Sequence, residues 1–490
     1  MKKLPILLLS ILLGCTFFAC DDLDDHYSSN PTHRLDFSTH LLSFDTIFST
    51  IGSTTKQFMI YNRNSEALNI ESILLAGAQE TGFRINVDGR KGDSFKNIAI
   101  LAKDSMYVFV EVTVNPNGTN QPLMIQDSVV FFFNGIKQSV VLEAYGQDVN
   151  LYKGGSVITN NTTLTAEKPY LIYDSLTIAK DAVVTIEKGA TFYMHDRAKI
   201  NVEGTLNAVG TKDQPITFRG DRLDFILNDV LPYDRTPGQW GGLFFKSESF
   251  DNILDHVIVR NGTTGIFCEQ SLPDRSKLKI DNSQITNMDG NLLSAVNCNV
   301  EVINSELTNA TGAVSSLIGG SYRFIHCTLA NFMTLKTRSS SHSLLLSNIL
   351  PGKDKDNDQT FPLTVSFDNC IIDGNHAAGT ESLKGELSLK PADGMDFNYR
   401  FNHCVIKTVG ENNDDFISSF FVKTGPSYTL LGGEKNKYVY NFRLDSATTV
   451  GVGKADPEIT KLYPVDRDGT NRLTSTNGPT IGVYEYVPVE

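Results

Sequence analysis

Basic residues are scarce in this chain. It has 43 lysines and arginines against 56 aspartates and glutamates in 490 residues, a formal net charge of −13 at pH 7. Nucleic-acid binding depends on Lys and Arg side chains that neutralise backbone phosphates. The charge balance therefore argues against a nucleic-acid partner. It suits solubility outside the cell and says little more about function.

Cysteine is also sparse, and its spacing does not suggest a scaffold. Two of the seven cysteines lie within the first 20 residues, and the other five are Cys268, Cys298, Cys327, Cys370 and Cys404. Five is an odd number and too few for a disulfide framework. No CxxC or Cys-x-x-His spacing occurs, which argues against a structural zinc site.

Long apolar runs are missing after the N-terminus. A membrane-spanning helix needs about 20 consecutive apolar residues, and no segment beyond residue 14 reaches that length. The N-terminal stretch "LPILLLSILLG" is itself shorter, and it follows Lys2 and Lys3. This order of a basic start and a short apolar run predicts a secretory signal peptide, to be left out of fold reasoning.

The end of this apolar stretch resembles the lipobox of bacterial lipoproteins, in which a small residue precedes the lipidated cysteine. "LLGC" ends at Cys15 and "FFAC" ends at Cys20, which is followed by four aspartates within residues 21–25. Such an acidic run resembles the surface-export signal of Bacteroidota lipoproteins. We favour Cys20 as the lipidation site, with Cys15 as the alternative. A plain secretory signal with incidental cysteines is a further alternative.

This resemblance implies a chain held in the outer membrane by a lipid anchor and facing the exterior. Removal of a signal peptide at 1–19 also removes two lysines, which changes the net charge from −13 to −15. Residues 20–34 are polar, acidic and contain a proline, a composition that predicts a flexible tether.

Residues 35–149 are expected to form an all-β sandwich. The stretch "SMYVFVEVTV" places apolar residues on one face at period two, as a half-buried strand does: Met106, Val108, Val110, Val112 and Val114. In "DSVVFFFNGIKQSVVLEAYG", Asn134-Gly135 suits the tight turn of a β-hairpin. Six or seven such strands are typical of an immunoglobulin-like sandwich. "FMIYNRNSEALNIESI" also resembles the Ig-like modules of the abnormal-spindle and hydin type, which implies a spacer or binding module.

Residues 150–490 show short strands with a Gly or Asn turn every few residues. The passage "VVTIEKGATF", "AKINVEGTLNAVG", "PITF" resembles the N-terminal coils of right-handed parallel β-helix proteins, and "QWGGLFF" at 239–245 continues the resemblance. The fold class expected for the whole chain is therefore all-β, with an N-terminal Ig-like β-sandwich followed by a right-handed parallel β-helix.

Six hexamers support a repeated coil: "ILDHVI" (253–258), "IDNSQI" (280–285), "VINSEL" (302–307), "FIHCTL" (324–329), "FDNCII" (367–372) and "FNHCVI" (401–406). Aligned in this way, their fourth position holds His256, Ser283, Ser305, Cys327, Cys370 and Cys404. Coils stack about 4.8 Å apart, so each position becomes a column of side chains. We interpret the cysteines as small interior residues and not as metal ligands, because pairs such as His326-Cys327 and His403-Cys404 cannot converge on one ion. The step of 43 residues between the fourth and fifth hexamers leaves room for an extra coil near "SLLLSNIL".

The closing stretch "PVDRDGTNRLTSTNGPTIGVYEY" resembles the final segment of many extracellular β-helix proteins of Bacteroidota. Val483 stands where Ala is usual, and the residues that match that pattern are Asp466, Gly469, Arg472, Ile481, Gly482, Tyr484 and Glu485. We expect this segment to cap the end of the β-helix, where open strand edges would otherwise be exposed, and to contain an Asp466–Arg472 pair.

Enzymatic β-helices cleave polysaccharides with paired carboxylates or with a Lys, Arg or His base. The best concentration of such groups is Asp255, His256 and Arg260 in "DHVIVRNG", with Glu269 and Asp281 on neighbouring coils. Asp255, His256 and Arg260 are weak catalytic candidates. The alternative is a set of polar residues that satisfy turns.

Two further candidates concern ligands. The spacing of an EF-hand loop is found at Asp354, Asp356 and Asp358, but the Gly at the sixth position and the Glu at the twelfth position of that loop are missing. We therefore expect a solvated loop, with a Ca²⁺ site as the weak alternative. No other cofactor is expected. Trp240 is the sole tryptophan and could stack on a sugar or cover a coil edge.

These observations favour a lipid-anchored surface protein that binds glycan or another surface ligand without catalysis. The alternatives are a polysaccharide lyase or glycoside hydrolase, and a structural adhesin or stalk.

Overall fold

A computed structural model describes residues 27–118, 121–227, 231–339, 341–354, 357–380, 383–430 and 440–488. The predicted signal peptide, both candidate lipidation cysteines and residues 20–26 of the predicted tether lie outside the described residues. The chain divides into two compact units, one ending at Asp148 and the other beginning at Val149. Each unit is described by itself.

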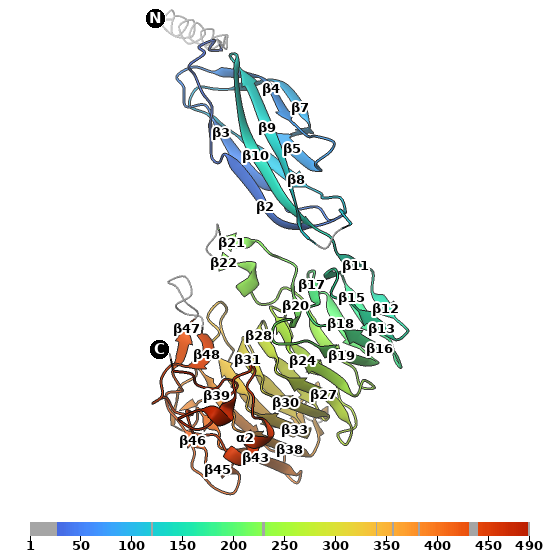
Figure 1. Cartoon of the computed structure of the whole chain (residues 1–490), viewed down its shortest axis with the longest axis vertical. Coiled ribbons are helices and arrows are strands. Elements are labelled where there is room, and N and C mark those ends of the chain that lie inside the picture. Colours follow the sequence, from blue (N-terminus) through green and yellow to red (C-terminus); the bar gives the residue numbers. More distant parts are fainter. Residues whose placement is uncertain are drawn as a thin grey trace, which may run out of the picture. The chain divides into compact units, whose positions relative to one another are not determined.

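The first unit is a two-sheet β-sandwich (Figure 1). Sheet A has the strand order β1-β3-β8-β5-β6, with bounds β1 Asp36–Phe37, β3 Lys56–Tyr61, β5 Phe83–Val87, β6 Arg90–Gly92 and β8 Ser105–Val112. Sheet B has the order β2-β10-β9-β4-β7, with bounds β2 Leu41–Phe48, β4 Leu68–Leu75, β7 Ser94–Ile100, β9 Leu123–Phe133 and β10 Ile136–Gln147. All pairs are antiparallel except β2 with β10.

The alternating apolar residues of this unit form its core as predicted. Val108, Val110 and Val112 of β8 are fully buried, and they share one core with Phe58 of sheet A and Phe131 of sheet B. Asn134 and Gly135 have φ of 48° and 70°, the left-handed conformation that a two-residue hairpin turn requires.

Part of the predicted tether is packed against this sandwich. The Ser28 amide donates to the Ala67 carbonyl at 2.8 Å, and the Asn134 side-chain amide donates to the Asn30 carbonyl at 3.2 Å. Residues 27–34 are therefore held in place, in contrast to the flexible segment that their composition predicts.

The second unit is built from three long sheets of parallel strands, an arrangement that matches a parallel β-helix (Figure 1). Each coil contributes a strand to sheet I, then to sheet II and then to sheet III, and pairs in parallel with the coil before it. In the described residues, sheets I, II and III have 11, 9 and 10 strands.

The strands of sheet I are β11 Asn150–Tyr152, β14 Tyr170–Ile172, β17 Thr191–Met194, β20 Ile216–Gly220, β25 Val257–Arg260, β28 Gln284–Met288, β31 Glu306–Ala310, β34 Thr328–Asn331, β39 Ile371–Gly374, β44 Val405–Ile406 and β46 Phe420–Phe421. Those of sheet II are β12 Ser156–Ile158, β15 Ser175–Ile178, β18 Lys199–Val202, β23 Gly242–Phe245, β26 Ile266–Cys268, β29 Leu293–Val296, β32 Ser315–Ile318, β35 Leu344–Ser347 and β42 Leu387–Lys390. Those of sheet III are β13 Thr162–Leu164, β16 Val183–Ile186, β19 Thr205–Val209, β24 Asn252–Asp255, β27 Ser276–Asp281, β30 Asn299–Ile303, β33 Gly320–Ile325, β38 Leu363–Asp368, β43 Phe397–Asn402 and β45 Phe416–Ile417.

Shorter elements interrupt or follow the coils. They are β21 Phe225–Leu227, β22 Leu231–Pro232, η2 Tyr233–Arg235, β36 Ile349–Leu350, β37 Gln359–Thr360, β40 Ala378–Thr380, β41 Leu383–Lys384, β47 Tyr428–Leu430, β48 Tyr440–Leu444, α2 Pro457–Leu462 and η5 Arg472–Thr474.

Parallel, in-register pairing turns repeated residues into columns. The rings of Phe324, Phe367, Phe401 and Phe416 stack inside the helix with centroids 4.7, 4.8 and 5.0 Å apart. Because burial of apolar rings stabilises the fold in proportion to the area removed from water, such columns hold successive coils together.

The fourth-position column of the hexamers satisfies backbone groups. The Ser283 amide donates to Ser305 Oγ at 3.0 Å, and the Cys404 amide donates to Ser419 Oγ at 3.2 Å. Cys370 Sγ accepts the Cys327 amide at 3.4 Å. All five cysteines of the described chain are buried and unbridged, so this column packs and hydrogen-bonds as a small-residue column should.

The register of the first hexamer differs from our alignment by one residue. Leu254 pairs with Ile280, so Asn282 lies opposite His256, and Ser283 opposite Val257. His256 therefore belongs to the preceding, third-position column. The extra coil near "SLLLSNIL" is also absent from the described pairing, because β33 pairs directly with β38. The step of 43 residues is one coil with long excursions.

The corrected third-position column has a common backbone conformation. Each member has φ between 42° and 55°: His256, Asn282, Asn304, His326, Asn369, His403 and Ser418. Asn and His are enriched at left-handed positions among non-glycine residues. Their recurrence thus reflects the sharp turn between sheets III and I, which we call the III–I turn.

The C-terminal segment lies along the side of the β-helix and not across its end. We call residues 425–430 and 440–488 the strap. The Val483 amide donates to Thr328 Oγ1 at 3.1 Å, and the Asp456 amide donates to Asn369 Oδ1 at 2.6 Å. Together with contacts to Asn304 and Asn402, the strap touches four successive coils. The expected end cap is therefore corrected to a lateral cover.

Buried polar groups fasten the strap. Arg472 is fully buried and donates to the carbonyls of Thr480 and Val483 and to Asn304 Oδ1. Burial lowers the pKa of Arg472 to about 10, so it stays charged at neutral pH. Its nearest carboxylate is Glu485 at 4.0 Å. The expected Asp466–Arg472 ion pair is not formed; Asp466 instead accepts backbone amides, including that of Glu485.

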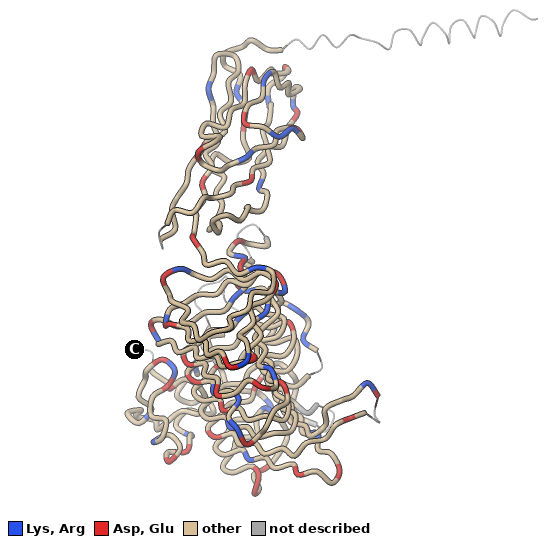
Figure 2. The backbone as a smooth tube through the Cα atoms, turned by 90° about the vertical axis from the view of Figure 1, so that its right-hand side faces the viewer, with Lys and Arg blue, Asp and Glu red and all other residues tan. Residues whose placement is uncertain are grey.

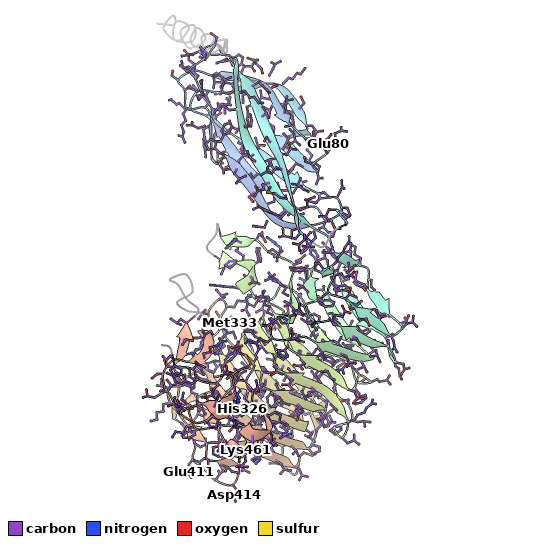
Figure 3. All side chains as sticks on the ribbon, in the orientation of Figure 1. Glu80, His326, Met333, Glu411, Asp414 and Lys461 are labelled. Atoms are coloured by element: carbon purple, nitrogen blue, oxygen red, sulfur yellow. The ribbon has the colours of Figure 1, made fainter. Side chains whose placement is uncertain are left out.

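The strap also covers polar and apolar side chains of the coils. His326 is buried against Thr460 of α2, with Nε2 and Oγ1 3.2 Å apart, and Figure 3 labels His326 close to Lys461 of the same helix. Burial lowers the pKa of His326 well below its ordinary value. Ile481 and Val483 pack on Ile371 of sheet I.

Candidate functional site

A large cleft lies at the turns in which the chain passes from sheet II to sheet III. Its volume is about 1080 Å³. We call it the II–III cleft and define it by Asp181, Glu203, Phe250, Glu269, Leu272 and Arg275, which lie in successive coils. Charged residues of both signs are interspersed along the coils of this unit (Figure 2).

Apolar side chains and a cation form one part of the cleft. The Arg275 guanidinium lies 4.3 Å from the centroid of the Phe250 ring and pairs with Asp251 at 2.6 Å. Leu272 is 62% exposed beside Pro273. An exposed Leu next to a half-buried aromatic ring gives the cleft apolar surface on which a ligand can pack.

Ion pairs line the rest of the cleft wall. Lys180 pairs with Glu248 at 2.8 Å. Lys246 pairs with Glu269 at 2.7 Å, just beside the cleft. The side chains of these pairs are about a third exposed or more, so each pair contributes little to stability.

Two carboxylates of the cleft are left without such partners. Among the described residues, neither Asp181 nor Glu203 forms a side-chain hydrogen bond or an ion pair within 4.0 Å. The turns that carry them lie against each other: a Cβ on Gly204 would come 2.2 Å from the Ala182 carbonyl oxygen. Glycine at position 204 therefore permits this close approach.

A buried lysine holds part of the cleft wall in place. Lys277 is fully buried, and its Nζ donates to the carbonyls of Lys246 and Ser249 at 2.6 and 3.2 Å. Burial lowers the pKa of Lys277. These bonds fix the turn that carries Phe250, so Lys277 positions the cleft wall.

The structure brings together two of the three predicted catalytic candidates. His256 Nδ1 lies 2.7 Å from Asp255 Oδ1, which also accepts the Asn282 side-chain amide at 3.1 Å. Burial alone would raise the pKa of Asp255, but the hydrogen bonds from His256 and Asn282 lower it below its ordinary value. Asp255 is therefore held ionised.

Asp281 lies next to Asp255 on the following coil. Burial, followed by the negative charge of Asp255, raises the pKa of Asp281 to about 6. The two carboxyls thus have pKa values driven apart, an arrangement that can combine an acid with a base. Together with the strap, His256, Asp281 and Lys212 line a small cavity of about 300 Å³.

Arg260 is separated from this pair. Its guanidinium pairs with Asp234 Oδ1 at 3.0 Å, and Arg219 pairs with the same oxygen at the same distance. Burial lowers the pKa of Arg260. This arginine fastens the insert that contains η2 to sheet I and does not join Asp255 and His256 at a common cavity.

Trp240 is fully buried, and its Nε1 donates to the Arg260 carbonyl at 2.8 Å. It therefore cannot serve as a surface platform for a sugar; it fills the coil interior beside Gly262.

Two aspartates of the EF-hand-like loop, Asp354 and Asp358, accept hydrogen bonds within local turns. Asp354 Oδ1 accepts the Asn357 side-chain amide at 2.5 Å, and Asp358 Oδ1 accepts the Gly352 amide at 2.8 Å. Asp356 lies outside the described residues. In the described ranges, no group of three or more His, Cys, Asp or Glu side chains has the arrangement of a metal site.

Of the residues that define the II–III cleft, our sequence analysis names only Glu269, beside Asp255 and His256, although a signal for the cleft exists. Glu203, Lys246 and Glu269 each follow the last residue of a sheet II strand, and the register of these strands places all three in one column. Seeing this column requires the sheet II register, which the hexamers, taken from sheets III and I, do not supply.

The described fold defines an all-β protein with a sandwich unit and a unit of three parallel sheets. Within the described residues, none of the helices has the length and apolar character needed to cross a membrane. No protein-family model matches the chain. The protein bark beetle of Drosophila melanogaster is 32% identical over 119 residues, which are 24% of this chain and 4% of that protein. The chain thus spans a small fraction of that relative's length.

Three solved structures show limited likeness. A protein of unknown function from Porphyromonas gingivalis is 13% identical, with a TM-score of 0.18, over 25% of this chain and 51% of its own. A family 123 glycoside hydrolase from Clostridium perfringens is 6% identical, with a TM-score of 0.16, over 23% and 26%. A PapD-like domain of human CEP192 is 10% identical, with a TM-score of 0.17, over 26% and 95%. Scores this low support no argument about function.

Proposed function

We propose that this protein is a lipid-anchored protein of the outer membrane that faces the exterior and binds glycan without catalysis. In this proposal, Cys20 carries the lipid, the sandwich is an Ig-like spacer, and a right-handed β-helix presents the binding site. The lipobox-like segment and the acidic run after it support the anchor. A β-helix-like fold suits a surface or glycan-related protein.

The II–III cleft is the observation that carries the binding proposal. Ligand sites combine apolar contact surface with a few polar groups that set orientation. The cleft offers Phe250 and Leu272 as contact surface, and Glu203 and Gln270 as hydrogen-bonding groups, in about 1080 Å³. Sugars present both C–H faces and hydroxyls, so this combination suits an oligosaccharide.

The binding test uses the chain from residue 21 onward on a glycan array, with two variants. Phe250→Ala removes the ring of the cleft; Phe267→Ala removes another half-buried ring of the same unit outside it. We expect wild type and Phe267→Ala to bind the same glycans and Phe250→Ala to lose them. Binding of protein or cells with no glycan on the array would favour a structural adhesin and contradict the proposal.

The anchor has its own test. Expression of the full chain with labelled fatty acid should label wild type and leave Cys20→Ser unlabelled. Label that persists in Cys20→Ser and disappears in Cys15→Ser would move the anchor to Cys15. No label in any form would leave a plain secretory signal. Protease treatment of intact cells reports whether the protein faces outward.

A second candidate function is polysaccharide cleavage at Asp255 and Asp281. Their divergent pKa values favour it, because a glycosidase needs one protonated and one ionised carboxyl group. This candidate predicts release of reducing or unsaturated oligosaccharides that Asp281→Asn and Asp255→Asn each abolish. A purified chain that binds polysaccharide and leaves its length unchanged contradicts this candidate.

A further inference from the structure

The charges that line the II–III cleft are not balanced. Lys180 and Arg275 are each paired with a carboxylate, and Glu269 is paired with Lys246. Asp181 and Glu203 form no ion pair within 4.0 Å in the described residues, although the charge of the neighbouring Lys180, which is paired with Glu248, attracts Asp181. The cleft therefore has a net negative charge when its three ion pairs are intact.

Asp181 and Glu203 belong to adjacent turns. The amides of Glu203 and Gly204 donate to the Ile178 carbonyl at 2.9 and 3.2 Å, which ties the second turn to the first. Asp181, with φ of 66°, lies at the sharp bend of that first turn. These contacts fix the backbone of the two turns, whereas both carboxylate side chains are exposed.

The apolar part of the cleft already holds a cation at its aromatic ring. Arg275 occupies one side of Phe250, and Lys277 Nζ lies 5.4 Å from the same ring centroid. Leu272 and Pro273 line the same cleft as Asp181 and Glu203, so a ligand that fills the cleft can contact both the apolar surface and the carboxylates. Negative charge on that ligand would be repelled by them and by the net charge of −13 on the chain.

From this arrangement we propose that the II–III cleft selects glycans that carry protonated amino groups, with Asp181 and Glu203 as the groups that recognise the amines. The ligand class is a polymer of free hexosamines. Its sugar rings pack on Phe250 and Leu272, and its ammonium groups pair with the two carboxylates. This inference rests on the proposed function of glycan binding.

Isothermal titration of the chain from residue 21 tests this selection with three probes: glucosamine oligosaccharides, their N-acetylated counterparts, and oligogalacturonate of equal length. The pH is kept where the glucosamine amines are protonated. We expect the glucosamine oligosaccharides to bind tightest and oligogalacturonate weakest. Their affinity should fall as salt is raised, because exposed ion pairs are screened.

Glu203→Gln and Asp181→Asn should each weaken glucosamine binding roughly two- to fivefold, the size expected for an exposed ion pair, and bring it closer to binding of the acetylated probe. Glu187→Gln is the matched control, since Glu187 is an exposed carboxylate of the same unit outside the cleft. It should change nothing.

The outcomes separate this inference from the proposed function. Equal or tighter binding of the acetylated or the uronate probe, or unchanged binding in Glu203→Gln and Asp181→Asn, overturns the charge selection and leaves glycan binding intact. Binding of a lysine-rich peptide in place of every oligosaccharide overturns both. Failure of all probes and of the glycan array also overturns both.

Discussion

The strap covers the III–I turns of the β-helix, whereas the II–III turns are left open. At the III–I turn, Asn304, His326 and Asn369 are hydrogen-bonded to the strap. At the II–III turn, Asp181 and Glu203 have no such partner in the described structure. A column of polar side chains along a β-helix can thus bind another segment of the same chain, which we call a seam. Alternatively, the column can remain open to a ligand. The difference lies in what covers the column.

The largest expected effect is on the seam. Arg472→Ala should lower the free energy of unfolding of the β-helix unit by about 3–5 kcal/mol, because it removes one partner from a buried polar network. Arg472→Lys should lose less, since it keeps the charge. Urea unfolding followed by the fluorescence of Trp240, the sole tryptophan and fully buried in this unit, measures it. A loss below about 1 kcal/mol, the size of an exposed pair, would show that the strap is not a structural seam.

The next effect is a pH dependence beneath the strap. Asp373 is fully buried and accepts the Tyr428 hydroxyl at 3.0 Å; burial raises its pKa from 3.8 to about 6. Between these values the folded state binds more protons than the unfolded state, so stability falls as pH rises from about 4 to about 6. The shift corresponds to about 3 kcal/mol.

Asp373→Asn should remove this slope. As the pH rises from 4 to 7, the free energy of unfolding of the variant should increase by about 3 kcal/mol relative to that of wild type. Urea unfolding at several pH values measures this difference. Parallel stability curves for the two proteins over that range would contradict the assignment.

A smaller effect is expected in the interior column. Cys404→Ser should cost about 1 kcal/mol, because Ser already occupies this column at other coils and the hydroxyl can donate to a nearby carbonyl as Ser305 does. Thermal unfolding measures the change. Metal analysis of wild type and variant should show equal content; metal lost from the variant would contradict the interpretation of Cys404 as a small interior residue.

The smallest effect on stability is expected at the open turn. Glu203→Gln should change the unfolding free energy by less than about 0.5 kcal/mol, as surface substitutions do, while it changes ligand binding. A larger loss would mean that Glu203 has a structural partner and that this column is also a seam.

The repeat is the part of the fold that the sequence predicts well. Apolar residues at fixed places in each hexamer require an interior column, whereas the left-handed turn at the Asn or His before each small residue is seen only in the structure. The first hexamer was misaligned because both Ile253 and Leu254 are apolar, and only Leu254 faces the interior while Ile253 is 37% exposed. Apolar character alone cannot separate two adjacent candidates.

The strap and the cleft depend on contacts that are distant in sequence. Arg472 meets Asn304 across 168 residues, and Lys246 meets Glu269 only because the strands of sheet II have a particular register. Local pattern carries no information about such pairs. Closeness in sequence alone suggests one site for Asp255, His256 and Arg260. The structure instead places Arg260 in an ion pair with Asp234.

The most direct test of the distinction between the two turns is a titration of glucosamine oligosaccharide into three proteins: wild type, Phe250→Ala at the II–III cleft and Asp281→Asn at the covered III–I turn. We predict that Phe250→Ala loses binding and that Asp281→Asn keeps wild-type affinity. Binding that is lost in Asp281→Asn and retained in Phe250→Ala would contradict the account and place the ligand beneath the strap.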